Sequence, residues 1–216
     1  MAKAKRKVKL SSTNNGITYV NSKAYQPHVR AERGTYTAIS LADGMKESTK
    51  AQTQANLMAK IVFDTVNNFS PNFKDGKFWS RLVAVFRQLL KQEHTNRYKL
   101  LQGMEVRPDY PTSKQGSFLL KKKLDAVQLH YSLKVDTDYR LSILRMATDR
   151  DMLIPYAKEI ITINIRADEL QGVAQLNFAS VADEASLLYV MKCEQLINGK
   201  LEGLLSQKSV SFLKVS

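Results

Sequence analysis

The sequence predicts an α+β fold in three parts: an N-terminal β-hairpin arm, a central αα-hairpin and a C-terminal antiparallel β-sandwich. Three observations lead to this prediction. β-branched residues surround an Asn-Gly turn near the start of the chain, apolar residues then recur at helical spacing, and from residue 118 onward apolar and polar residues alternate. We therefore divide the chain into a basic tail and hairpin arm (1–47), a helical hairpin (48–106), a linker (107–117) and a sandwich (118–216).

The arm contains the turn sequence Asn-Asn-Gly at residues 14–16. Residues 17–20, Ile-Thr-Tyr-Val, suit a strand, whereas Pro27 restricts the next segment to a sheet edge or a bend. Because the arm has few large apolar residues, we expect its strands to join another sheet, in the rest of the chain or in a neighbouring copy. The candidate assembly residues of the arm are Ile17, Tyr19, Val20 and Tyr25.

The helical part is expected to hold two helices, over residues 48–68 and 77–92, and a short third one over 96–101. Ser48 or Thr49 can cap the first helix, because a hydroxyl accepts a bond from an otherwise unpaired amide. The second helix has a broad apolar face. Trp79, the single tryptophan, is interpreted as a core anchor of this hairpin rather than as a binding platform.

The predicted sandwich begins with strict alternation over residues 127–135, and shorter alternating runs follow it. Six or seven short strands with turn signals between them are typical of a β-sandwich of this length. Asn198-Gly199 is a hairpin signal. Cys193 shares a strand face with Tyr189 and Met191, so we expect a buried structural thiol.

The composition argues against most enzyme classes. Of the 216 residues, 44% are apolar and 25% charged, which is typical of a globular protein. The lone cysteine excludes an intramolecular disulfide, and His28, His94 and His130 lie in separate segments without ligand spacing. No phosphate-binding glycine loop or G-x-S-x-G turn occurs, and the acidic pairs fall at expected turns. We expect no catalytic residues, no cofactor and no metal.

The sequence also lacks targeting signals. No run approaches the roughly 18 apolar residues that cross a bilayer, and no apolar segment follows the basic start of the chain. We therefore expect no membrane span and synthesis in the cytoplasm without a signal peptide. A virion or another assembled particle is a candidate final location.

The positive charge of the chain is concentrated at its front. The formal net charge is +13, and residues 1–34 hold eight basic residues and one acid, a net charge of +7. Such a tail can be a solubilising, frayed terminus, or it can bind nucleic acid phosphates or an acidic protein surface. The candidate contacts to nucleic acid or another polyanion are Lys3, Lys5, Arg6, Lys7, Lys9, Lys23, Arg30 and Arg33.

Several phrases of the chain resemble a family of small, uncharacterised Bacteroidota proteins that carry domain-of-unknown-function labels. The phrases are Gly16–Val20 and Val29-Arg30 in the hairpin, the helices over 48–68 and 77–92, Leu100–Val106, Asn198–Lys200 and Phe212–Val215. The first helix departs from the family pattern, because Thr49–Gln52 stands where a Thr-Arg-Glu-Asn phrase is common. The resemblance implies no activity. It implies a basic N-terminal hairpin, a helical pair and a C-terminal sandwich of the immunoglobulin-like or fibronectin-like kind.

These features favour a non-enzymatic structural subunit that associates with itself in a virion, a filament or a surface component. The core-poor arm motivates this hypothesis, since sheet edges accept a strand from the next copy. The alternative is a nucleic-acid-associated protein that binds phosphate backbones through residues 1–34, where tyrosines lie among the cations. The expected partners are therefore further copies of the chain, and nucleic acid or another polyanion.

Overall fold

The structure, a computed structural model, describes residues 12–20, 28–31, 42–91, 98–123, 126–182 and 185–216. The chain divides into two compact units, with the boundary after Lys46, and each unit is described by itself. The predicted fold class is confirmed at the level of an α+β protein with antiparallel sheets.

The first unit contains a three-stranded antiparallel sheet in the order β1-β2-β3. Its strands are β1 (Ser12–Asn14), β2 (Ile17–Val20) and β3 (His28–Ala31). Between β1 and β2, Asn15 and Gly16 have φ angles of 49° and 73°. Two successive positive φ angles are what a tight two-residue turn requires, and Asn-Gly is the dipeptide that tolerates them best. We call this sheet the arm sheet.

The second unit begins within α1 (Asp43–Phe69), which starts five residues before the expected cap at Ser48. It packs against α2 (Phe78–Leu89), where the ring of Phe63 stacks on that of Phe78 at a centroid distance of 5.8 Å. Trp79 corrects an expectation, because it is 37% exposed and meets Phe63 edge-on, whereas Phe78 is fully buried. The expected third helix is a short turn, η1 (Lys99–Leu101), and residues 92–97 lie outside the described ranges.

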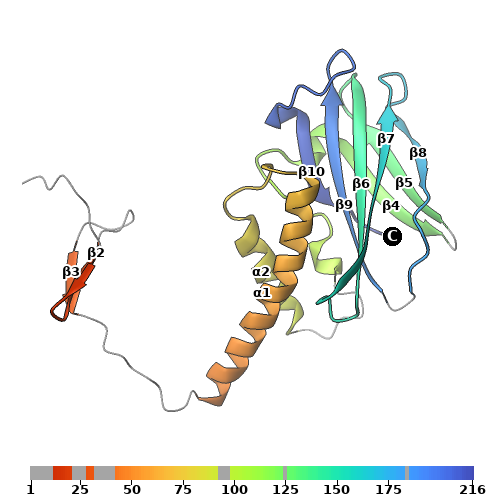
Figure 1. Cartoon of the computed structure of the whole chain (residues 1–216). Helices are drawn as coiled ribbons and strands as arrows, with labels where there is room; N and C mark the ends of the chain where they lie inside the picture. Colours follow the sequence, from red (N-terminus) through yellow and green to blue (C-terminus); the bar gives the residue numbers. More distant parts are fainter. Residues whose placement is uncertain (1–11, 21–27, 32–41, 92–97, 124–125, 183–184) are drawn as a thin grey trace, which may run out of the picture. The chain divides into compact units, whose positions relative to one another are not determined.

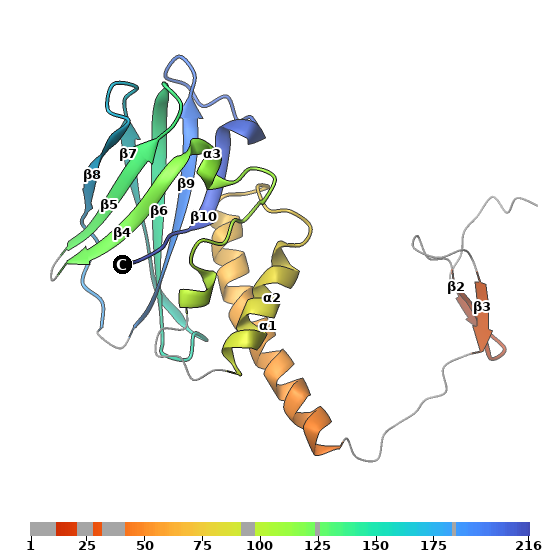
Figure 2. The ribbon, with the colours of Figure 1, turned by 180° about the vertical axis from the view of Figure 1, so that it is seen from behind.

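Two antiparallel sheets face each other in the second unit (Figures 1 and 2). The small sheet has the order β4-β5-β8, and the large sheet has the order β10-β9-β6-β7. The strand bounds are β4 (Gly116–Lys123), β5 (Ala126–Leu133), β6 (Asp138–Thr148), β7 (Pro155–Ile165), β8 (Gln171–Leu176), β9 (Ser186–Leu196) and β10 (Lys208–Phe212). Two short turns of helix, α3 (Thr112–Gln115) and η2 (Leu205–Gln207), precede β4 and β10.

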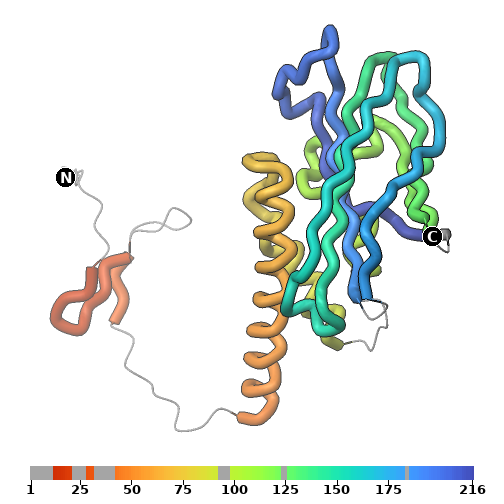
Figure 3. The backbone as a smooth tube through the Cα atoms, turned by 45° about the vertical axis from the view of Figure 1, so that its right-hand side comes forward, coloured from red at the N-terminus to blue at the C-terminus, as the bar shows by residue number. Residues whose placement is uncertain are grey.

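The large sheet is buried on both faces along β6 and β9, which creates two cores. Leu141 and Ile143 of β6 join the cluster toward the small sheet, while Leu144 and Met146 join the cluster under the helices. Figure 3 shows the helices on one side of the sheets. The cluster under the helices draws on β6, β9 and β10 but on no residue of β7. The helical layer therefore leaves the edge strand β7 bare.

Candidate assembly surface

The arm sheet carries an apolar face on two neighbouring strands. Ile17 and Tyr19 alternate along β2, and the register sets them opposite Ala31 and Val29 of β3. Ile17 is 41% exposed, Tyr19 39% and Val29 59%. Cross-strand neighbours lie on the same face of a sheet, so these side chains form one exposed apolar surface.

The opposite face of the arm sheet is more polar. Thr18 pairs with Arg30 across the strands, and its hydroxyl lies 3.1 Å from that of Thr13. Val20, which pairs with His28, alternates with Tyr19 and so lies on this second face. Of the predicted assembly residues, the sheet therefore brings Ile17 and Tyr19 together and sets Val20 apart.

Most of the predicted polyanion contacts cannot be placed in this sheet. Arg30 is exposed on β3. The remaining predicted residues lie outside the described ranges: Lys3, Lys5, Arg6, Lys7, Lys9, Lys23 and Arg33, and with them the assembly residue Tyr25.

Two of the four outer edges of the large and small sheets are closed by segments of the chain itself. Along β10, the amides of Gly103 and Val106 donate to the carbonyls of Phe212 and Val210, at 2.8 and 2.9 Å. Along β4, the amide of Leu120 donates to the carbonyl of Lys214 at 2.9 Å, and residues 214–216 continue this pairing. Closing an edge removes the row of backbone groups that would pair with another chain.

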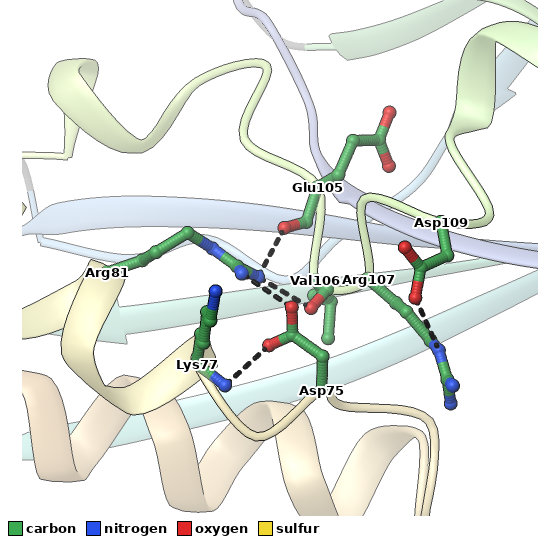
Figure 4. Close-up of polar contacts among 7 residues, drawn as sticks. All are labelled: Asp75, Lys77, Arg81, Glu105, Val106, Arg107 and Asp109. Carbon is green, nitrogen blue, oxygen red and sulfur yellow. Dashed lines mark hydrogen bonds and ion pairs between the residues drawn. The ribbon is translucent and has the colours of Figure 1, made fainter. Parts of the chain in front are cut away.

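A polar cluster fastens the segment that closes β10 (Figure 4). Arg81 of α2 bonds the Asp75 carboxylate at 2.6 Å and donates to the carbonyls of Glu105 and Val106 at 3.2 and 2.9 Å. The Asp75 carboxylate also accepts from the amide of Lys77, at the start of α2. Burial alone raises the pKa of Asp75, but the hydrogen bond and the charge of Arg81 lower it below its usual value.

The side chain of Glu105 points away from Arg81 and forms a separate set of hydrogen bonds (Figure 4). Its two carboxylate oxygens accept from the amide and the hydroxyl of Thr112, at 2.8 and 2.9 Å. These bonds satisfy the first turn of α3, although burial still raises the pKa of Glu105. This short helix lies within the predicted linker over 107–117, which also holds the first residues of β4.

The other two outer edges, those of β7 and β8, are open within the described part of the chain. Among the described strands, β7 pairs only with β6, and β8 pairs only with β5. At 11 residues, β7 is about twice as long as an average strand, whereas natural proteins tend to keep edge strands short. A long open edge is a template for a further strand.

The outer face of β7 is bare as well. Its even-numbered side chains are exposed, and among them Tyr156 is 50% and Ile160 58% exposed. The candidate assembly residues predicted from the sequence did not include Ile160. The signal was present, because Ile160 and Ile161 are adjacent in the sequence and must point to opposite faces of the strand.

A buried ion pair fixes β7 from within the sandwich. Arg145 of β6 is 5% exposed and donates to Glu159 of β7 at 2.8 Å and to the Ala179 carbonyl at 2.6 Å. The Ala179 amide donates in turn to Glu159 at 3.0 Å, and the Arg145 guanidinium lies 4.6 Å from the ring centre of Phe178. These hydrogen bonds tie β7 to β6 and to the segment at Ala179.

The single cysteine lies in the interior of the second unit. Burial raises the pKa of Cys193, which is fully buried, as predicted for a structural thiol. Among the described ranges, no three His, Cys, Asp or Glu residues are grouped to hold a metal ion. No helix in the same ranges has the length and apolar character needed to span a membrane.

Comparison of the chain with protein families, with curated proteins and with solved structures finds no match.

Proposed function

We propose that this protein is a non-enzymatic structural subunit that associates with itself into a virion, filament or surface component through its N-terminal arm. One observation carries the proposal: the arm sheet exposes Ile17, Tyr19 and Val29 on a single face. The strands of this sheet are only three and four residues long, so they bury little apolar surface themselves, and the sheet gains stability when a second surface covers its apolar face.

The proposal includes an immunoglobulin-like sandwich as the body of the subunit. Numbering β4 to β10 as strands A to G gives the sheets A-B-E and G-F-C-D. The immunoglobulin constant arrangement is A-B-E-D and C-F-G, so only the fourth strand changes sheets. That strand is β7, and its position here makes it the outer strand of the large sheet.

Deletion of residues 1–34 tests the proposal, with light scattering on a sizing column as the measurement. The full chain is expected to elute as an assembly, and the truncated chain as a single copy. Both apolar cores consist of residues from Ala55 onward, so the truncated chain should keep its circular dichroism spectrum and its urea midpoint. A truncated chain that still assembles contradicts the proposal.

A matched pair of arm variants sharpens this test. Tyr19→Ser removes an aromatic side chain from the apolar face, and Thr18→Ser makes a small change on the opposite face of the same strand. Assembly should weaken in the first variant and persist in the second, because Tyr19 contributes apolar area to the face that carries the proposal, whereas Thr18→Ser keeps the hydroxyl of the polar face. Equal behaviour of the two variants argues against the apolar face.

A second candidate function rests on charge. Residues 1–34 carry a net charge of +7, and Arg30 is exposed, which favours binding of nucleic acid phosphates. In the same sizing experiment, protein that elutes as a single copy together with nuclease-sensitive ultraviolet absorbance supports this function over self-association. Binding that falls steeply with salt and exceeds the binding to heparin strengthens it further.

A further inference from the structure

We propose that β7 is the acceptor for the arm of a second copy, and that it pairs antiparallel with β3 so that Val29 faces Ile160 and Arg30 faces Glu159. This inference rests on the proposed self-association and names the surface that receives the arm. The contact extends the large sheet of one copy with the three strands of the other, by the addition of a strand to an open edge.

The first support is that the two strands offer matching edges. β7 pairs only with β6, and β3 pairs only with β2, so within the described residues each has one edge without a partner strand. The chain closes the outer edges of β10 and β4 with its own segments, whereas no described segment closes the edge of the 11-residue β7. Antiparallel addition continues the pattern of all the sheets in the structure.

The second support is the agreement of side-chain faces in this register. Val29 is 59% exposed and Ile160 is 58% exposed, and their cross-strand contact removes apolar surface of both from water. One residue further along, Arg30 comes opposite Glu159. The Glu159 side chain is 32% exposed, although it is bonded to Arg145. An opposite-charge pair across two strands adds to the contact, and a shift of one residue loses both matches.

The third support is charge complementarity between the two parts of the chain. Residues 149–182, which contain β7, β8 and their flanking turns, hold five acidic and three basic residues, a net charge of −2. Residues 1–34 carry +7. In a chain with a net charge of +13, the open side of the sandwich is an acidic stretch, and the arm is the most basic one.

Charge also argues against pairing of β7 with β7 of a second copy. An antiparallel pair of this kind brings the β6–β7 turn of one copy, where Asp149 and Asp151 flank Arg150, toward the β7–β8 turn of the other, where Asp168 and Glu169 follow Arg166, so that two turns of net charge −1 approach each other. Like charges that face each other across an interface weaken it. The second open edge, that of β8, is a poorer acceptor because the strand has six residues and exposes glutamines on either side of Val173.

Disulfide trapping between differently tagged copies tests the inference. One protein carries Val29→Cys and the other Ile160→Cys, and both substitutions are at exposed positions. Directly opposed residues of an antiparallel pair come close enough for a disulfide, while the native Cys193 is buried and stays unreactive. After mixing and mild oxidation, we expect a heterodimer on a non-reducing gel. Circular dichroism checks that each variant is folded.

The control partner carries Val173→Cys on β8 in place of Ile160→Cys, since Val173 has a similar exposure of 54%. A heterodimer with this control alone moves the acceptor to β8, and homodimers of Ile160→Cys alone indicate β7–β7 pairing. Either result overturns the inference, as does the absence of any cross-link. If deletion of residues 1–34 abolishes assembly in that case, the proposed function survives while the β7 acceptor fails.

Charge reversal gives an independent test of the register. Arg30→Glu sets a carboxylate opposite Glu159 and should lower the trapping yield of Val29→Cys with Ile160→Cys. Lys50→Glu, on an exposed position of α1, makes the same change of net charge and should leave the yield unchanged. A yield that responds equally to both variants would reflect net charge and overturn the proposed register.

Discussion

The side chain of Arg81 joins three segments of the chain: α2, the turn before α2 and the segment that closes β10. It binds the turn before α2 through Asp75 and the segment that closes β10 through two backbone carbonyls. A guanidinium with several donors in fixed directions suits this task, whereas an ammonium could not reach the same set of acceptors. The edge of the large sheet is therefore closed by backbone bonds that a side chain holds in place.

Replacement of Arg81 should weaken the second unit. In Arg81→Met the two carbonyls and the Asp75 carboxylate lose charge-assisted hydrogen bonds, which should lower the free energy of unfolding by about 1–3 kcal/mol. Urea unfolding followed by circular dichroism measures the change. Lys46→Met is the matched control, since its ion pair with the 94% exposed Asp43 contributes little. A loss no larger than that of the control contradicts this role for Arg81.

At the scale of single elements, the start of β4 depends on a glycine. The backbone φ of Gly116 is extended, so the requirement is one of space. A Cβ at this position would overlap the carbonyl oxygen of Ser132 on β5, the strand that β4 pairs with. Backbone atoms of a paired strand cannot move aside as the end of a flexible side chain can.

Gly116→Ala should therefore destabilise the small sheet, by about 1–3 kcal/mol as for other overpacked positions. Gly76→Ala is the control, because a Cβ there meets nothing within 4 Å. Thermal unfolding of the two variants measures the difference. Equal midpoints would show that β4 shifts to accept the methyl group at no cost.

The elements also show what the sequence could predict. Alternation identified the strands of the sandwich, and the Asn198-Gly199 signal is confirmed by positive φ angles of 51° and 71°. Periodicity says which residues share a face but not what covers that face. Strand β6 illustrates this, because Leu141 and Leu144 lie on opposite faces and are both buried, in different cores. The face of Leu144 is buried because the helices cover it.

The sequence predicted an arm that needs a partner, with Ile17 and Tyr19 among its assembly residues. These two side chains share one exposed face of the arm sheet, and their role in assembly stays a prediction. The acceptor strand escaped prediction because the openness of an edge depends on strand order, which is a property of long-range pairing. In the same way, nothing local in residues 103–106 reveals that they lie beside β10.

For the whole molecule, the uneven charge predicts how assembly responds to salt. If the arm at +7 docks on the stretch at −2, raising the salt from about 0.05 to about 0.5 M should shift the onset of assembly to higher protein concentration, since it shortens the screening length about threefold. Light scattering across a dilution series measures the shift. Assembly that strengthens with salt would instead indicate a purely apolar contact.

The two closed edges also constrain the order in which the chain is made. The segments that close them, at 103–106 and 214–216, meet β10 and β4 only when residues 208–216 are present. During synthesis, β9 and β4 therefore leave the ribosome with unpaired edges. These edges are closed only after β10, the last of the described elements, has been made. Unpaired strand edges on neighbouring nascent chains can pair with one another, so we expect early pairing of β10 to limit premature association.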